Sequence, residues 1–232
     1  MTETLASERA LRGDLNIWWR LGAPVVVLLV RAIFRVRVAG IHHVPLDGPA
    51  ILAFVHVSVL DGPCLAAEVA WRRRRTVRFL VASEIFNVPV SGWFLRRYRQ
   101  IPVRRGKSDA GALDEVIATI RRGTVAAIAP EGTVNPAPGS LQRIRSGIAR
   151  IALPTGAPVI PVGIWGTQHR WSKAGRRWGR PLRSRLGFAF GPAIEPSGDA
   201  SAQDDIDDFV ARVREGLERQ LAGARSLAGD PP

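Results

Sequence analysis

The sequence is poor in cysteine and in lysine. The first shortage excludes a disulfide framework, and the second leaves arginine as the main source of positive charge. Cys64 is the only cysteine among 232 residues, so a disulfide framework is excluded and nothing requires an oxidising compartment. Lys107 and Lys173 are the only lysines, so the net charge of +13 is carried almost entirely by arginine. A surface this basic should attract polyanions, whether phosphorylated small molecules, anionic lipid headgroups or nucleic acid.

The chain also lacks a secretory signal and a long uninterrupted apolar run. Glu3 and Glu8 lie near the N-terminus, and no small-residue cleavage site follows a short apolar core. In the apolar segment 17–34, Arg20 and Arg31 bracket an uncharged core that is about half of the ~20 residues a spanning helix needs. The segment is compatible with a helix in the membrane interface and equally with a core helix of the domain.

Short apolar runs of strand length alternate with helical patterns along the chain. Buried strands are expected over 50–55, 77–82, 124–129 and 158–165, and helices over 64–71, 108–122 and 146–153. This alternation predicts an α/β sandwich, with a mixed, mostly parallel sheet flanked by helices and ligand-binding loops at the strand ends. An apolar content of 46% suffices for one full-sized core, and no repeat or linker divides the chain.

A histidine and an aspartate stand close together where one of these strands gives way to a helix. His56 follows the apolar run, and Asp61, with Gly62 and Pro63 after it, resembles a helix entry with an acidic cap. A short loop can fold one side chain onto the other. Such an aspartate would hold the proton on one imidazole nitrogen and leave the other free to take a proton from a hydroxyl.

A lone histidine near an aspartate is more often a structural pair than a catalytic one, so the interpretation depends on signals elsewhere. Three later stretches lie at strand ends: Ile101–Gly106, Pro130–Thr133 and Val159–Gly163. Together with His56-x4-Asp61 they resemble the four motifs of the glycerolipid acyltransferase family, the lysophosphatidic acid acyltransferases. Any one motif is a weak signal, whereas four in this order and spacing are a strong one.

The resemblance extends over roughly residues 36–192 and includes Gly92 before the second motif. It also includes Arg145-x-Gly147, where the family usually has a lysine before a glycine-led helix. The family implies transfer of a fatty acyl group from a thioester to a hydroxyl of a phosphorylated glycerol. No cofactor or metal is implied, because acyl-CoA or acyl carrier protein serves as a co-substrate.

By this resemblance His56 is the general base and Asp61 is its orienting partner. An alcohol is a poor nucleophile at neutral pH, so a positioned imidazole suits the reaction, and an arginine forks well onto phosphate oxygens. The residues expected to bind the acceptor belong to the second and third motifs or follow them: Arg104, Arg105, Glu131, Gly132, Thr133 and Arg145.

The sequence departs from the family pattern at several positions. Val55 stands where asparagine is common, Ser83 where lysine often occurs, and Arg104 where an acidic residue is frequent. Val134 and Asn135 replace the Arg-Ser that usually follows Glu-Gly-Thr. The expected acceptor is 1-acylglycerol 3-phosphate, giving phosphatidic acid, and these departures leave glycerol 3-phosphate, a lysophospholipid or a glycolipid as alternatives.

Two other classes of protein compete with this interpretation. The charge of +13 and the segment 170–185, where Trp171 and Trp178 alternate with basic residues, are compatible with nucleic-acid binding. That class leaves the four motifs unexplained, and a membrane surface accounts for the same charge, so no nucleic-acid partner is expected. A hydrolase with Ser58 or Cys64 as nucleophile is the second alternative, but the Gly-x-Ser-x-Gly elbow is missing.

The expected organisation therefore has three parts: an N-terminal membrane-associating helical segment (1–34), an acyltransferase domain (35–222) and a flexible tail (223–232). The expected partners are acyl-CoA, lysophosphatidic acid or a related phosphorylated glycerolipid, and an anionic membrane surface. The expected location is the cytoplasmic face of the cell membrane, with the protein peripheral or monotopic.

Overall fold

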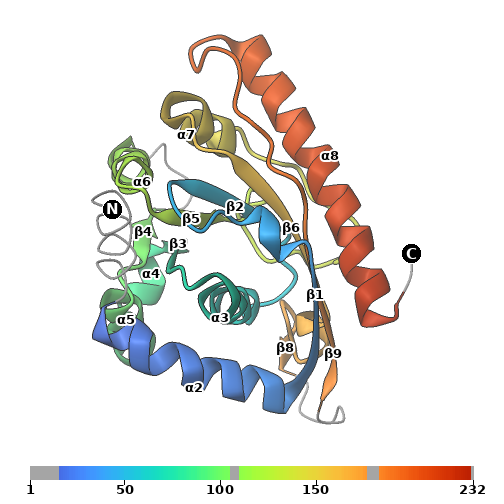
Figure 1. Ribbon diagram of the computed structural model, residues 1–232. Coiled ribbons are helices and arrows are strands. Elements are labelled where there is room, and N and C mark those ends of the chain that lie inside the picture. Colours follow the sequence, from blue (N-terminus) through green and yellow to red (C-terminus); the bar gives the residue numbers. More distant parts are fainter. Residues whose placement is uncertain (1–15, 105–109, 177–182, 231–232) are drawn as a thin grey trace, which may run out of the picture.

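A seven-stranded sheet forms the centre of the molecule (Figure 1). The computed structural model describes residues 16–104, 110–176 and 183–230. The strands of the sheet lie in the order β1-β9-β6-β2-β5-β3-β4, and β7 and β8 form a separate hairpin. The strand bounds are β1 Phe34–Ala39, β2 Ala50–Phe54, β3 Val77–Ala82, β4 Ile101–Val103, β5 Val125–Ile128, β6 Val159–Trp165, β7 Trp171–Ser172, β8 Gly175–Arg176 and β9 Ser184–Phe190.

The direction of the strands brings several strand ends to one edge. β2 pairs in parallel with both β5 and β6, and β3 pairs in parallel with β4 and β5. β9 is antiparallel to β6, and β1 is parallel to β9. The carboxyl ends of β2, β3, β5 and β6 therefore meet at the same edge, and the predicted α/β fold with a mixed, mostly parallel sheet is confirmed.

Helices cover both faces of the sheet. In Figure 1, α2 and α3 lie on one face and α6, α7 and α8 lie on the other, with α4 and α5 beside β3 and β4. The helix bounds are α2 Ile17–Ile33, α3 Asp61–Arg73, α4 Ser83–Phe86, α5 Pro89–Arg97, α6 Ala110–Arg121, α7 Gly147–Thr155 and α8 Gln203–Ala228, with 3-10 turns at Ile41–His43 and Thr167–His169.

Strand β2 is buried on both faces, as is typical of a strand inside a parallel sheet. Leu52 and Phe54 join the apolar cluster beneath α2 and α3, whereas Ile51 and Ala53 join the cluster beneath α6, α7 and α8. The alternation continues past the strand, because Val57 belongs to the α8-side cluster. Val55 belongs to the same cluster as Val57. The side chain at position 56, which lies between these two, therefore emerges on the α2–α3 side.

The long C-terminal helix α8 packs tightly across β6 and β9. A Cβ atom at Gly163 would lie 1.9 Å from the Gln220 carbonyl oxygen, and one at Gly187 would lie 2.1 Å from the Ala224 oxygen. Glycine in the strands thus allows the helix backbone to approach. The expected flexible tail from residue 223 is wrong, since α8 continues to Ala228, whose side chain is buried together with that of Ala224.

The segment between β3 and β4 is helical, although it contains Pro89 and Gly92, residue types that are common in turns. Pro89 sits in the first turn of α5, where its missing N–H costs nothing. Gly92 allows α5 to fold against α4, because a Cβ atom there would lie 2.0 Å from the Phe86 carbonyl oxygen. The proline and glycine that resemble turn signals are therefore parts of a tight helix–helix junction.

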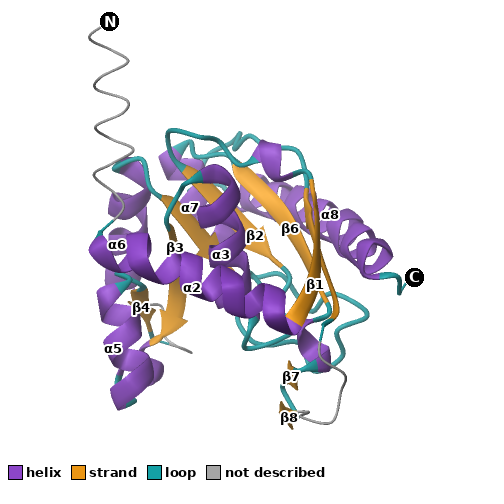
Figure 2. Ribbon diagram, turned by 60° about the horizontal axis from the view of Figure 1, so that its bottom comes forward, coloured by secondary structure: helices purple, strands orange, loops and turns teal. Residues whose placement is uncertain are grey.

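Helix α2 has a buried apolar side and an exposed apolar side. Trp19, Val27 and Val30 are buried, and the helix lies against α3 (Figure 2). On its other side Leu21 and Leu28 are 64% and 70% exposed. Among the helices that the structure describes, none has both the length and the apolar character needed to cross a membrane.

Candidate active site

His56 and Asp61 meet at the carboxyl end of β2, as the sequence predicted. His56 Nδ1 lies 3.0 Å from Asp61 Oδ2, the aspartate side chain is fully buried, and the imidazole is 21% exposed. A neutral imidazole that donates from Nδ1 carries its lone pair on Nε2. The geometry therefore leaves one partly exposed ring nitrogen able to accept a proton.

The carboxylate of Asp61 is held by the loop that precedes it. Its Oδ2 accepts hydrogen bonds from the Val57 and Ser58 N–H groups at 2.7 and 2.8 Å. Its Oδ1 accepts from the Thr167 hydroxyl at 2.5 Å. The expected acidic helix cap is wrong in detail, because this carboxylate points back to the loop and the N-cap position is Leu60, which makes no side-chain cap.

Thr167 is a site residue that the sequence analysis did not identify. It is fully buried in the 3-10 turn after β6, and it reaches Asp61 across 106 positions of the chain. A hydroxyl directly after a buried strand was the only available signal. Its contact depends on β6 lying next to β2 in the sheet, which the order of motifs does not reveal.

Glu131 holds the backbone of His56. Its Oε1 accepts from the His56 N–H at 3.1 Å, while Oε2 accepts from the Asn135 side-chain amide and from the Gln142 N–H, both at 3.0 Å. Only 3% of Glu131 is exposed. With both oxygens occupied by protein donors, this side chain positions the catalytic loop and is poorly placed as the acceptor ligand that the resemblance implied.

Asn135, one of the departures from the family pattern, completes this network. Its side-chain N–H groups donate to Glu131 and to the Ser140 carbonyl oxygen, the latter at 2.6 Å, and its Oδ1 accepts from the Ala137 N–H at 2.9 Å. Its own backbone N–H donates to the His56 oxygen at 2.7 Å. The third motif is therefore tied to the first through both side chain and backbone.

Gly132 and Arg145 lie against each other at the edge of the same network. Gly132 has a φ of 74°, and a Cβ atom there would lie 2.9 Å from Arg145 Nε. Glycine is thus required both by the left-handed conformation and by the guanidinium above it. The Arg145 side chain is exposed and makes no hydrogen bond or ion pair within the ranges described, and the half-buried Thr133 follows Gly132.

The second motif lies farther along the edge. Arg104 directly follows β4, which is three strands from β2 in the sheet order, or about 14 Å at the usual ~4.8 Å spacing. Arg104 is exposed and takes part in an interaction of its own. Arg105 lies outside the described residues. Of the predicted acceptor contacts, Glu131 bonds directly to the His56 backbone, and Gly132, Thr133 and Arg145 adjoin Glu131.

The two candidate nucleophiles of a hydrolase are unsuited to that role. Ser58 is fully buried, and its hydroxyl donates to the Trp171 carbonyl oxygen at 2.5 Å. Burial raises the pKa of the Cys64 thiol far above its usual value, and the negative charges of Asp61 and Glu68 raise it further. A buried protonated thiol is inert, which leaves the partly exposed imidazole of His56 as the candidate catalytic group at this edge.

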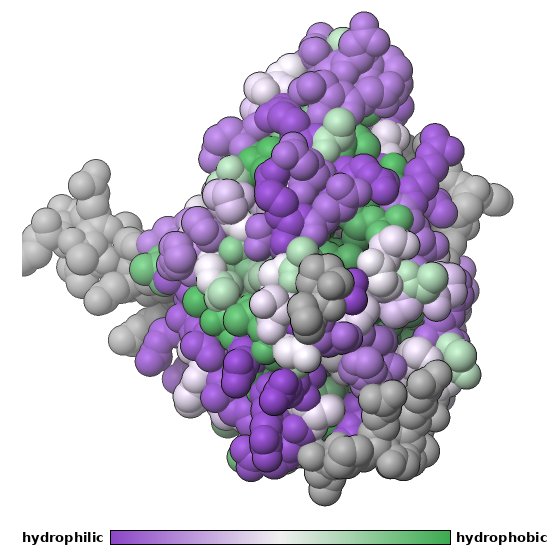
Figure 3. Space-filling view, turned by 90° about the vertical axis from the view of Figure 1, so that its right-hand side faces the viewer, coloured by the Kyte–Doolittle hydropathy of each residue, from purple (hydrophilic) through white to green (hydrophobic). Residues whose placement is uncertain are grey.

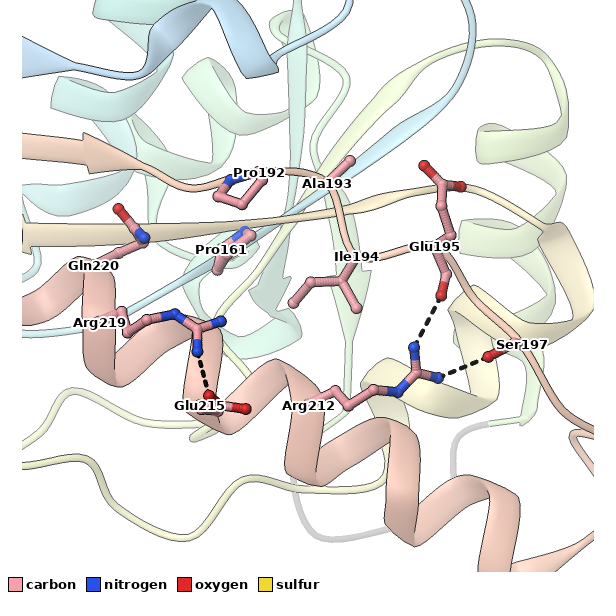
Figure 4. Close-up of a pocket in the computed structure, with 10 residues that line it drawn as sticks. All are labelled: Pro161, Pro192, Ala193, Ile194, Glu195, Ser197, Arg212, Glu215, Arg219 and Gln220. Atoms are coloured by element: carbon pink, nitrogen blue, oxygen red, sulfur yellow. Dashed lines mark hydrogen bonds and ion pairs between the residues drawn. The ribbon is translucent and has the colours of Figure 1, made fainter.

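The described residues form at least two hollows of similar volume. One of about 520 Å³ adjoins the catalytic loop at Val57 and Asn135. The other, of about 450 Å³, lies between α8 and the segment 192–197 (Figure 4). There Arg212 donates to the Glu195 carbonyl oxygen, and Arg219 pairs with Glu215, so the charges are matched within the wall. Neither His56 nor Asp61 reaches this second hollow.

A partly exposed histidine hydrogen-bonded to a buried aspartate, at the carboxyl edge of an α/β sandwich, defines a class of site suited to activating a hydroxyl. A protein-family model described as Acyltransferase matches residues 35–165, which is more than half of the chain. The chain belongs to this family, and the resemblance to glycerolipid acyltransferases drawn from the four motifs is confirmed.

A solved structure supports the same assignment at the level of the fold. The crystal structure of the 1-acyl-sn-glycerophosphate (LPA) acyltransferase PlsC from Thermotoga maritima is similar with a TM-score of 0.65 and 26% sequence identity. The similarity covers 95% of this chain and 83% of that one.

Sequence relatives include proteins with different acceptors. A chloroplastic 1-acyl-sn-glycerol-3-phosphate acyltransferase of Brassica napus is 27% identical over 58% of this chain and 38% of its own length. A lyso-ornithine lipid O-acyltransferase of Pseudomonas aeruginosa is 30% identical over 66% of this chain and 54% of its own length. An uncharacterised protein of Mycobacterium tuberculosis is 27% identical over 88% of this chain, which spans 66% of that relative's length.

Proposed function

We propose that this protein transfers a fatty acyl group from acyl-CoA to the free hydroxyl of 1-acylglycerol 3-phosphate, which yields phosphatidic acid. The observation that carries the proposal is the 3.0 Å contact between His56 Nδ1 and the buried Asp61 carboxylate. This contact supports the tautomer that carries its proton on Nδ1 and uses Nε2 as the base. Family membership supplies the reaction class, and the structure supplies the residues to which it is assigned.

In the proposed reaction, His56 Nε2 removes the proton of the acceptor hydroxyl while its oxygen bonds to the thioester carbonyl carbon. The tetrahedral oxyanion then collapses, the carbon–sulfur bond breaks, and the leaving thiolate takes the proton from the imidazolium. Asp61 stabilises that imidazolium and keeps the ring in place. A positioned base of this kind contributes about 10²–10⁴-fold to the rate.

The acceptor phosphate is assigned to Arg145 and the adjoining Gly132 and Thr133. Arg145 is exposed, held against Gly132, and has no competing carboxylate within the described ranges. A guanidinium can bind a phosphate through two parallel hydrogen bonds. Arg104, farther along the edge, is assigned a supporting role, and Arg105 is assigned one from its place in the second motif alone.

A second acceptor class has a specific basis. The relative from Pseudomonas aeruginosa is a lyso-ornithine lipid O-acyltransferase, and Val134 occupies the position of an arginine in the third motif of the family. With one fewer cationic side chain, the site should be less selective for an acceptor that carries a phosphate. A lysolipid with another headgroup is therefore the alternative acceptor.

An assay of the wild-type protein with palmitoyl-CoA separates these acceptors. The panel contains 1-acylglycerol 3-phosphate, glycerol 3-phosphate, a lysophospholipid and lyso-ornithine lipid. The proposal expects the largest kcat/KM with 1-acylglycerol 3-phosphate, and Arg145→Ala should raise KM for that acceptor much more than for palmitoyl-CoA. A preference for lyso-ornithine lipid that Arg145→Ala leaves unchanged would select the alternative.

We further propose that the protein sits on the cytoplasmic face of the cell membrane through an apolar face shared by α2 and α5. This face consists of Leu21, Leu28, Val90, Trp93 and Phe94, which are all exposed. The two helices lie side by side in Figures 1 and 2. Exposed apolar area of this extent, flanked by arginine, suits insertion into the interface of an anionic leaflet.

An aromatic seam joins the two helices of this face. The rings of Trp18 and Trp93 are 5.0 Å apart, and the Arg97 guanidinium lies over both, at 5.1 and 5.6 Å. Tryptophan and arginine together are typical of the headgroup level of a membrane. The seam would hold the two helices as one inserting unit.

Flotation with anionic vesicles across a salt series tests the membrane proposal. Leu28→Glu and Val90→Glu should each weaken binding, since a charge would enter the apolar layer. Ala211→Glu, at an exposed position on α8, is the matched control and should bind like wild type. Because apolar burial remains, salt alone should not release the wild-type protein completely. Unchanged flotation of both α2 and α5 variants would refute this face as the anchor.

A further inference from the structure

The hollow of about 520 Å³ lies on the opposite side of the catalytic loop from the imidazole. Val57 and Trp165 line it, and both belong to the apolar cluster on the α8 side. The His56 ring instead packs against the ring of Phe54 on the α2–α3 side, with 5.5 Å between the ring centroids. The turn between β7 and β8 contributes Ala174 to the wall.

This hollow and the catalytic site share one stretch of backbone. Val57, in its wall, directly follows His56 in the chain. Asn135, also in its wall, donates its backbone N–H to the His56 oxygen at 2.7 Å. A molecule in the hollow would therefore be separated from one at the imidazole only by the backbone around residues 56 and 57.

Gln168 and Lys173 contribute hydrogen-bond donors to the hollow. Gln168 is 94% buried, and its Oε1 accepts from the Gly166 N–H at 2.7 Å. Its Nε2 has no hydrogen-bond partner in the structure, which is unusual for a buried amide and calls for an acceptor. Lys173 adds an exposed ammonium group at the rim.

Much of the remaining wall is apolar, although Asn135, His169 and Ser172 also line the hollow. Pro136 and Pro138 face the hollow, together with the ring of Trp165. An occupant that suits these walls has methylene segments, carbonyl oxygens to accept from the unpaired amide, and a negative group to meet the lysine. It is an extended, amphipathic molecule with acceptors and a terminal anion.

We propose that the hollow binds the carrier arm of the acyl donor, the phosphopantetheine chain of acyl-CoA. That arm alternates methylene groups with amide carbonyls and ends in phosphate, so it matches the walls, the Gln168 amide and Lys173 in turn. The assignment rests on the proposed acyl transfer. The thioester carbonyl would then lie at the sheet edge, beside the backbone of residues 56 and 57. The carrier arm would lie on the α8 side of that backbone, and the acceptor on the side of the His56 imidazole.

Filling the hollow provides the test. Ala174→Trp places a large ring at an exposed turn position in its wall, and Ala211→Trp on the outer face of α8 is the matched control. Two donors are compared: palmitoyl-CoA, and the N-acetylcysteamine thioester of palmitate, which lacks most of the arm. Binding of CoA alone to each variant is measured by calorimetry, and Lys173→Ala serves as a milder second variant.

We expect Ala174→Trp to raise KM for palmitoyl-CoA by at least about tenfold, with KM for the truncated thioester and for the acceptor unchanged. CoA binding should weaken in parallel, and Ala211→Trp should match wild type in every measurement. Equal effects on both donors, an effect on the acceptor alone, or CoA binding equal to wild type would each overturn the assignment. Failure of the proposed function would instead appear as no acyl transfer by the wild-type protein, and the CoA measurement remains decisive in that case.

Discussion

The catalytic edge and the outer face of α8 both carry acidic side chains with polar partners, yet the two regions differ in burial. At the catalytic edge the Asp61 carboxylate is fully buried and accepts from two backbone N–H groups and a hydroxyl, besides the imidazole. On α8, the Glu215 and Arg219 side chains form an i,i+4 pair while 69% and 56% exposed. Figure 3 shows the side toward α8, where hydrophilic residues predominate.

This difference indicates where the charges matter. A buried carboxylate must be compensated by every donor around it, so the loss of one donor is costly. An exposed ion pair is screened and solvated, and it typically contributes less than about 1 kcal/mol. The satisfied buried side chains of Asp61, Glu131 and Asn135 surround His56, and satisfied polar groups of this kind are what a preorganised active site requires.

The largest effect should come from the buried carboxylate. Asp61→Asn should lower kcat by about 10²–10⁴-fold, because the amide can place a donor against His56 Nδ1 and favour the wrong tautomer. Asp208→Asn, which changes an exposed acid paired with Arg212 at 3.1 Å, is the matched control and should retain wild-type turnover. Similar losses in both variants would erase the distinction between the two regions.

Thr167 should have a smaller but specific effect. Thr167→Val keeps the side-chain volume and removes the hydroxyl that donates to Asp61, so kcat should fall by roughly tenfold with KM unchanged. Thr167→Ser retains the donor and should recover most of the turnover. If serine and valine behave alike, the hydroxyl has no positioning role.

Glu131 should act mainly through stability. In Glu131→Gln the new amide N–H group faces the donors of Asn135 and Gln142, so the free energy of unfolding should fall by about 1–3 kcal/mol. Urea denaturation measures this loss, and KM for the acceptor should stay near its wild-type value. A raised KM for the acceptor at unchanged stability would instead support a direct contact between Glu131 and the acceptor, as the resemblance implied.

The smallest effect belongs to the surface of α8. Arg219→Ala should change the free energy of unfolding by no more than about 0.5 kcal/mol, since its partner Glu215 remains solvated. Acyl-transfer activity should be unaffected. A loss as large as that of Glu131→Gln would show that the outer face is a structural element in its own right.

The sequence predicted the sheet and the catalytic pair because both are local signals. The apolar runs at β2, β5 and β6 are buried strands, and the five-residue spacing of His56 and Asp61 lets them meet across one turn. Their partner Thr167 was missed because its contact spans 106 positions and depends on strand order.

Two other differences have equally physical causes. Glu131 carries a motif signal, but a sequence does not reveal which way its carboxylate points, and in the fold it turns inward to the His56 N–H. The tail expected from residue 223 is part of α8 instead, because small alanine side chains give no clear signal of burial in a sequence. Ala224 and Ala228 are buried there against the sheet, which their small size permits.

The most direct measurement is acyl transfer by His56→Ala, assayed with palmitoyl-CoA and 1-acylglycerol 3-phosphate alongside its thermal unfolding. The account predicts a loss of kcat of at least about 10²–10⁴-fold, with a melting temperature near wild type, because the imidazole is a partly exposed side chain at the end of the strand. Near-normal turnover in a folded His56→Ala protein would contradict the assignment of His56 as the general base.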